Sequence, residues 1–194
     1  MTPIVVTPPA AEPITLEEAK AHLRVVVADD DNYITGLITA ARMMVEQRTQ
    51  RAMMPQTIAI GLDKFCPVVQ LPRAPFIYSL ATPPVVIKYF DENGDLQTLA
   101  ESVYHVNKYV EPAEVSLVAG QSWPSITPQP GGVTMEYQAG YADAASVPGP
   151  LKQWMLLAIG AMYDNRDQVY TGAETYPLPE SFMGLLWQPY MVYT

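Results

Sequence analysis

The last quarter of the chain limits most strongly what it can fold into. Residues 151–163 form an apolar run with helical spacing and one charge, Lys152, and the run stops at the polar stretch 164–167. The residues that follow are rich in proline and aromatic side chains and carry two charges, Glu174 and Glu180. A small soluble domain rarely leaves so much aromatic surface uncovered. This segment is therefore expected to lie against another surface, in its own domain or in a neighbouring copy.

The composition predicts one domain, or a compact core with one inserted subdomain. Of the 194 residues, 49% are apolar and 16% are charged, so the chain can bury a sizeable core and wholesale disorder is excluded. The 19 prolines fall in clusters, which is typical of several loops and arms around a folded centre.

The charge balance argues against nucleic-acid binding by the chain as a whole. Eleven Lys and Arg face twenty Asp and Glu, a net charge of −9, whereas nucleic-acid binders need a basic footprint. An acidic surface suits a passage through which DNA slides without sticking, and this is a hypothesis that only a fold can test. The single cysteine, Cys66, permits no internal disulfide and indicates a reducing compartment. With no signal peptide and a longest apolar stretch of about half a bilayer span, a soluble protein made in the cytoplasm is expected, with no membrane partner.

Three helices are predicted. Thr15 and Glu18 form a capping box at the start of the first, and Asp29–Asp31 are expected to cap a longer second helix that ends near Gln50. The third is expected to start near Leu151.

Between the second and third helices the apolar period changes to that of strands. Asn93-Gly94 is a strong hairpin signal between two of them. The predicted strands are 57–62, 85–90, 96–99, 104–106, 115–118 and 133–138.

The predicted fold is α+β, a small helical bundle built from both ends of the chain with an inserted β-rich subdomain. The expected parts are a flexible N-terminal arm (1–13), a helical domain (14–55 plus 148–167), the β-rich subdomain (56–147) and an extended C-terminal arm (168–194). Removing residues 176–194 is expected to leave a folded domain that no longer assembles.

No catalytic, cofactor-binding or metal-ligating set is predicted. Asp29–Asp31 could form an acid/base or metal cluster, but a helix cap explains them. Asp91, Asn93 and Asp95 have the spacing of a calcium loop, but Leu96 stands where the loop needs glycine, which favours a hairpin turn. His22 and His105 are not brought together, and no phosphate-binding glycine loop or nucleophile elbow is present.

The sequence does predict an assembly interface. The Met43-Met44 and Met53-Met54 pairs suit either core packing or an adaptable subunit surface. The residues predicted to lie at this interface are Tyr170, Tyr176, Phe182, Leu185, Leu186, Trp187, Tyr190 and Tyr193.

Several segments, in order and spacing, resemble the head–tail adaptor (head-completion or connector) proteins of long-tailed double-stranded DNA phages and gene-transfer particles. They cover about residues 13–194. Met191 departs from the pattern, where an arginine is expected. The matching segments are 13–24, 40–49, 56–57, 71–75, 89–94, 122–124, 140–141, 147–148 and 163–166.

The resemblance implies a structural protein, not an enzyme, in the virion neck. It implies a homo-oligomeric ring, twelve-fold like the portal, that lies beneath the portal protein, extends the DNA channel without reading DNA sequence, and offers a platform to the stopper or tail. The alternatives are another neck or tail component, such as a stopper or tail-terminator, and an enzyme or metal-binding module acting through Asp29–Asp31.

Overall fold

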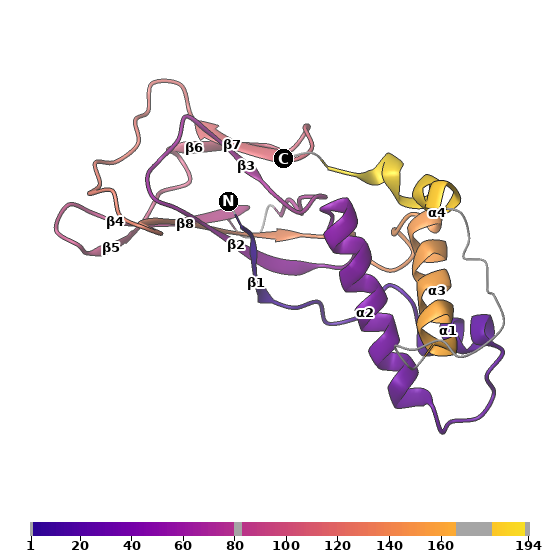
Figure 1. Ribbon diagram of the computed structural model, residues 1–194. Coiled ribbons are helices and arrows are strands. Elements are labelled where there is room, and N and C mark those ends of the chain that lie inside the picture. Colours follow the sequence, from indigo (N-terminus) through magenta and orange to yellow (C-terminus); the bar gives the residue numbers. More distant parts are fainter. Residues whose placement is uncertain (1, 80–82, 166–179, 193–194) are drawn as a thin grey trace.

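The computed structural model describes residues 2–79, 83–165 and 180–192, without the side chains of 180–182. It shows an α+β fold, as predicted, with a β lobe at one end and a helical lobe at the other (Figure 1). The elements are β1 (Ile4–Thr7), α1 (Leu16–Leu23), α2 (Asp31–Thr49), β2 (Gln56–Leu62), β3 (Val68–Leu71), β4 (Val85–Phe90), β5 (Leu96–Thr98), β6 (Tyr104–Asn107), β7 (Ala113–Leu117), β8 (Val133–Ala139), α3 (Gly149–Asp164), α4 (Glu180–Trp187) and the 3₁₀ turn η1 (Gln188–Tyr190).

The β lobe consists of two antiparallel sheets. Five strands in the order β1-β2-β8-β4-β5 form one sheet, and three in the order β3-β7-β6 form the other. β2 and β8 alternate between buried and more exposed residues, as strands with one covered face must. Their buried residues, among them Ile58, Ile60 and Met135, share one core with Val69 and Val115 of the smaller sheet. The two sheets therefore cover one another's apolar faces.

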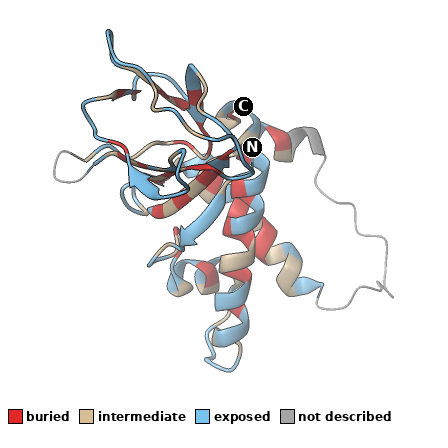
Figure 2. Ribbon diagram, turned by 90° about the vertical axis from the view of Figure 1, so that its left-hand side faces the viewer, coloured by how far each residue is buried: buried red, intermediate tan, exposed pale blue. Residues whose placement is uncertain are grey.

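The helical lobe has a core of its own. The predicted stripe along α2, including Ile34, Ile38 and Val45, is buried against Leu151 and Met155 of α3. Full burial of one such aliphatic side chain contributes about 1.5–3 kcal/mol. In Figure 2 the buried residues lie along the side of α2 that faces the other helices, while its outer side is exposed. Helices from both ends of the sequence thus pack together, as expected.

One of the two predicted helix caps is confirmed in full, and at the other the cap residue lies in the predicted stretch but its side chain makes no capping bond. The Thr15 amide donates to Glu18 Oε2 at 2.8 Å, and the Glu18 amide donates to Thr15 Oγ1 at 3.1 Å. Asp30 is the N-cap residue of α2, but its side chain makes no capping hydrogen bond. It accepts a hydrogen bond from the Tyr163 hydroxyl at 2.5 Å, while Asp31 forms an ion pair with Lys20 at 2.5 Å. These carboxylates tie α2 to α3 and α1, and tertiary contacts replace the local cap.

Both ends of the chain differ from the prediction. Residues 4–7 are not a flexible arm but the edge strand β1, paired antiparallel with β2. Their β-branched sequence, Ile-Val-Val-Thr, suits a strand between Pro3 and Pro8. At the other end, residues 180–187 are helical rather than extended. The sequence does not predict β3, because it lies in a proline-rich stretch.

We predict that Gly140→Ala strongly destabilises the fold. Gly140 follows β8 with φ +134°, and an added Cβ would lie 2.2 Å from the Met54 carbonyl oxygen. Backbone strain of this kind alone costs about 1–3 kcal/mol, and the clash adds to it. Urea unfolding measures the loss. The matched control is Gly36→Ala in α2, where a Cβ meets nothing within 4 Å, so a gain of about 0.5–1 kcal/mol is expected. Equal stability of the two variants would contradict the prediction.

Candidate assembly interface

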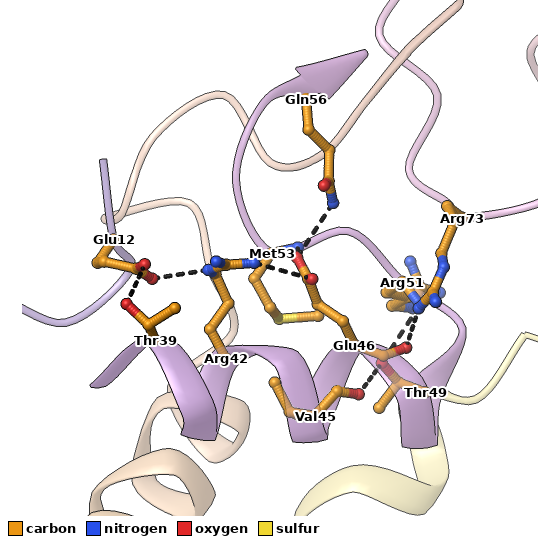
Figure 3. Close-up of polar contacts among 10 residues, drawn as sticks. All are labelled: Glu12, Thr39, Arg42, Val45, Glu46, Thr49, Arg51, Met53, Gln56 and Arg73. Carbon is orange, nitrogen blue, oxygen red and sulfur yellow. Dashed lines mark hydrogen bonds and ion pairs between the residues drawn. The ribbon is translucent and has the colours of Figure 1, made fainter. Parts of the chain in front are cut away.

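A buried carboxylate joins the helical lobe to the β lobe (Figure 3). Glu46 projects from α2, and its Oε1 accepts hydrogen bonds from the Met53 amide at 2.9 Å and from Gln56 Nε2 at 3.1 Å. Its Oε2 accepts from Arg42 Nη1 at 3.0 Å. Burial raises the pKa of the Glu46 carboxyl above its ordinary value, although the Met53 amide and Arg42 act to lower it. The turn between α2 and β2 is therefore fixed by one side chain.

The same network holds the segment that follows β1. Arg42 Nε donates to Glu12 Oε2 at 2.7 Å, and Glu12 Oε1 accepts from the Thr39 hydroxyl at 2.9 Å. Arg73, in the loop after β3, donates to the Glu46 backbone carbonyl. The segment after β1, the α2–β2 turn and the loop after β3 are thereby all fixed on one side of α2.

The C-terminal segment is bound to the helical lobe by its backbone and by aromatic contacts. The Arg51 guanidinium donates to the Tyr190 carbonyl at 2.6 Å and also pairs with Glu111. The Val192 amide donates to the Thr49 carbonyl at 2.9 Å. The guanidinium of Arg48 lies near the rings of Trp154 and Trp187, 5.8 and 5.6 Å from their centroids, within the range of a cation–π contact. The end of α2 is the docking point of this segment.

The predicted interface residues divide into three groups. Tyr170, Tyr176 and Tyr193 lie outside the described residues, and so does the side chain of Phe182. Leu185 projects outward and is 69% exposed.

The remaining three, Leu186, Trp187 and Tyr190, are half-buried against the helical core. These three side chains therefore pack within their own subunit, and Leu185 is the predicted residue that the described structure leaves open to a partner. Because Val192 is also buried, removing residues 176–194 takes away part of the helical lobe. The deletion is now expected to reduce stability as well as assembly.

The two methionine pairs differ in burial. Met53 and Met54 are buried in the helical core, whereas Met43 is 59% exposed on α2 and Met44 is partly exposed. Beside Met43 runs a groove of about 410 Å³, which Val5, Pro8 and Pro9 also line. The sequence signal for this surface was present in Met43, but its partner β1 was missed because the N-terminal segment was expected to be flexible.

Other apolar side chains are exposed away from the C-terminal segment. Val26 is 93% exposed and Val27 is 55% exposed, both in the loop between α1 and α2. Ile4 and Val6 on β1 and Leu96 on β5 are also open. Exposed apolar patches on a folded domain mark surfaces that a partner covers. The described chain exposes apolar side chains on more than one side.

The acidic turn considered as a calcium loop has a structural role. Asp91 Oδ1 accepts from the amides of Asn93 and Asp95 at 2.9 and 3.0 Å, which closes the predicted hairpin turn and holds the pKa of Asp91 below its ordinary value. Among the described residues, no group of three or more His, Cys, Asp or Glu could hold a metal ion. Within the same ranges, no helix is long and apolar enough to cross a bilayer.

Comparison with known proteins gives a family match over part of the chain and a fold for the whole of it. Residues 13–97 match the family of phage gp6-like head-tail connector proteins, which confirms the resemblance seen in the sequence. No curated protein matches the chain.

Three solved structures share its fold over the whole chain and 97% of theirs. One is a chain of the neck of an empty gene transfer agent particle, computed with C6 symmetry (19% identity, TM-score 0.77). The second comes from the virion of a native gene transfer agent particle (21% identity, TM-score 0.75). The third comes from the neck of a native particle, computed with C12 symmetry (21% identity, TM-score 0.68).

We predict that the stability advantage of the wild type over Glu46→Gln shrinks as the pH rises above 4.5, the ordinary pKa of this group. The raised pKa means that the folded state holds the Glu46 proton more tightly than the unfolded state does. Folding is then favoured at low pH, and this contribution falls as the pH rises through the ordinary and then the raised pKa. Urea unfolding across the pH range measures the difference. The exposed Glu92→Gln variant supplies the baseline, and a Glu46→Gln difference that grows with pH would contradict the prediction.

We also predict that Arg51→Met loosens the C-terminal segment. The variant loses the charge-assisted bond to the Tyr190 carbonyl and the pairing with Glu111, at an expected cost of about 1.5–3 kcal/mol. Hydrogen exchange of the Met191 and Val192 amides should accelerate. Arg24→Met, which removes an exposed guanidinium from the α1–α2 loop, is the control. Unchanged protection at Val192 in the Arg51 variant would show that the segment is held by its apolar contacts alone.

Proposed function

We propose that this chain, which matches the phage head-tail connector family over residues 13–97, is a structural protein of the virion neck. It acts as a head–tail adaptor: copies form a ring beneath the portal, extend the DNA channel and present a docking platform to the stopper or tail. The observation that carries this proposal is the likeness of the whole chain, at TM-scores up to 0.77, to chains of gene transfer agent necks. The role needs no catalytic step.

The symmetry of the matched particles supports the proposal of a ring. The necks were computed with C6 and C12 symmetry, and a cyclic ring requires each copy to offer two different faces to its two neighbours. Exposed apolar side chains supply contact surface on separate parts of the molecule: those of β1, Met43 on α2, and the valines of the α1–α2 loop. A ring of twelve copies, matching the portal, is the stoichiometry we propose.

The negative charge of the chain suits the wall of a channel through which DNA passes. A net charge of −9 per copy gives a ring of twelve a strongly negative potential, which repels the phosphate backbone. DNA would then pass through the ring without being retained. No sequence-specific reading of DNA is part of the proposal.

The test is binding to the vertex of the particle. The purified chain is incubated with DNA-filled, tailless heads and the portal vertex is imaged by cryo-electron microscopy. A ring of this chain directly below the portal is expected. An undecorated portal, with the chain found on tails, would replace the adaptor role with that of a stopper or tail-terminator.

We predict that Leu185→Asp lowers occupancy of the vertex without unfolding the chain. Leu185 is 69% exposed on α4, so a charge there costs the isolated domain little but penalises burial against a partner. Thermal unfolding checks the fold, and the fraction of decorated vertices measures binding. The matched control is Val118→Asp, an exposed apolar position after β7. Full occupancy by the Leu185 variant would show that the outer side of α4 contacts neither the portal nor a neighbour.

A further inference from the structure

Two exposed apolar features of this chain have complementary shapes. One is concave: the groove between β1 and α2, here called the β1–α2 groove, has a volume of about 410 Å³. Val5, Pro8, Pro9 and Met43 supply its apolar lining, and Val5 and Met43 are 50% and 59% exposed. Its polar lining is Arg42, Glu46, Gln47, Gln56 and Arg73.

The other feature protrudes. The loop between α1 and α2 carries three consecutive valines, residues 25–27, here called the valine loop. Val26 is 93% exposed, the largest exposed fraction among the large apolar side chains of the described residues. In Figure 1 the valine loop lies beyond the N-terminal end of α2, on the side of α2 opposite to β1. One chain therefore cannot fill its own groove with this loop.

The groove is rigid, which suits a surface that receives another chain. Arg42 and Glu46 are held by the network that joins the two lobes, and Glu12 fixes the backbone just after Pro9. A preorganised site loses little conformational freedom when it is filled. The valine loop is also held at both ends, by the α1 C-cap at Arg24 and by the Lys20–Asp31 ion pair.

Charge complements shape. The groove lining contains two arginines and one glutamate, and among the described residues Arg73 has no carboxylate within ion-pair distance. The valine loop leads directly into Asp29, an exposed carboxylate. Asp30 and Asp31 are already bonded to Tyr163 and Lys20. An apolar loop followed by an exposed carboxylate matches an apolar groove with an arginine that donates to the Glu46 backbone carbonyl but is in no ion pair among the described residues.

We propose that, in the ring, the valine loop of one copy inserts into the β1–α2 groove of the next copy. The inference rests on the proposed function, because only a ring makes the contact repeat around an axis. Both halves of the contact belong to the same chain and lie on opposite sides of α2, as a head-to-tail interface requires. Val26 and Val27 lie against Val5 and Met43 of the neighbour, and Asp29 lies beside the neighbour's Arg73.

The first experiment places a charge in each half of the contact. Val26→Asp and Met43→Asp are each incubated with DNA-filled, tailless heads, and the vertex is imaged beside the wild type. We expect both variants to keep the wild-type melting temperature and to lose the ring from most vertices. Leu96→Asp changes an equally open apolar position on β5, outside the contact, and is expected to keep the ring.

The second experiment detects the contact directly. In a Cys66→Ser background the chain has no other thiol, so Val26→Cys and Met43→Cys can be introduced singly and together. Rings of the double variant, assembled on heads and oxidised, should yield a ladder of covalent oligomers on a denaturing gel. Each single variant should remain monomeric on the same gel.

The outcomes test the valine-loop contact and the adaptor function separately. A ring that forms with both aspartate variants, or one that gives no ladder with the double cysteine variant, overturns the valine-loop contact and leaves the adaptor function standing. Disulfide dimers of a single variant would show a two-fold contact and also overturn it. A vertex that the wild-type chain leaves bare overturns the adaptor function, and the ring contact falls with it.

Discussion

The arrangement of the two lobes depends on one buried carboxylate. Glu46 receives hydrogen bonds from an arginine of its own helix, from the backbone of the α2–β2 turn and from the first residue of β2. Removing one partner of a buried ion pair typically costs about 3–5 kcal/mol, because the other charge remains unpaired in a poor solvent. Here the loss would also free the turn that sets the angle between the lobes. The network thus fixes geometry as much as it adds stability.

The segment after β1 and the C-terminal segment are both held by residues of α2 and of the turn that follows it. Arg42 holds the N-terminal segment through Glu12, while Arg48, Arg51 and the Thr49 carbonyl hold the C-terminal one. The surfaces argued to contact other proteins therefore move with this helix as one body. A displacement of α2 on assembly would reach the groove, α4 and the β lobe together.

Most of the fold could be predicted from the sequence because its signals are local. The period of Ile34, Ile38 and Val45 predicted α2, and Asn93-Gly94 predicted the β4–β5 hairpin. The missed elements depend on distant partners: β1 is a strand because β2 offers it an edge, and α4 is covered by α3. Nothing in the sequence shows that Arg48 lies over the Trp187 ring or that Arg51 donates to the Tyr190 carbonyl, so these contacts within the chain were not predicted. The Met43-Met44 pair suited either core packing or a subunit surface, and the groove beside Met43 depends on the position of β1.

The chain enters and leaves the β lobe at neighbouring points. Gln56, where β2 begins, is paired with Ala139, where β8 ends, so the first and last strands of the insertion close its base. The loops at the far end of the lobe, such as the β4–β5 hairpin, lie beyond that closure and away from the helices (Figure 1), whereas Arg73 and Glu111 contact Glu46 and Arg51. Insertions or deletions in those loops would change the outline of the lobe while the helical lobe kept its packing. Evolution could thus fit the chain to different partners on that side without altering the surfaces carried by the helices.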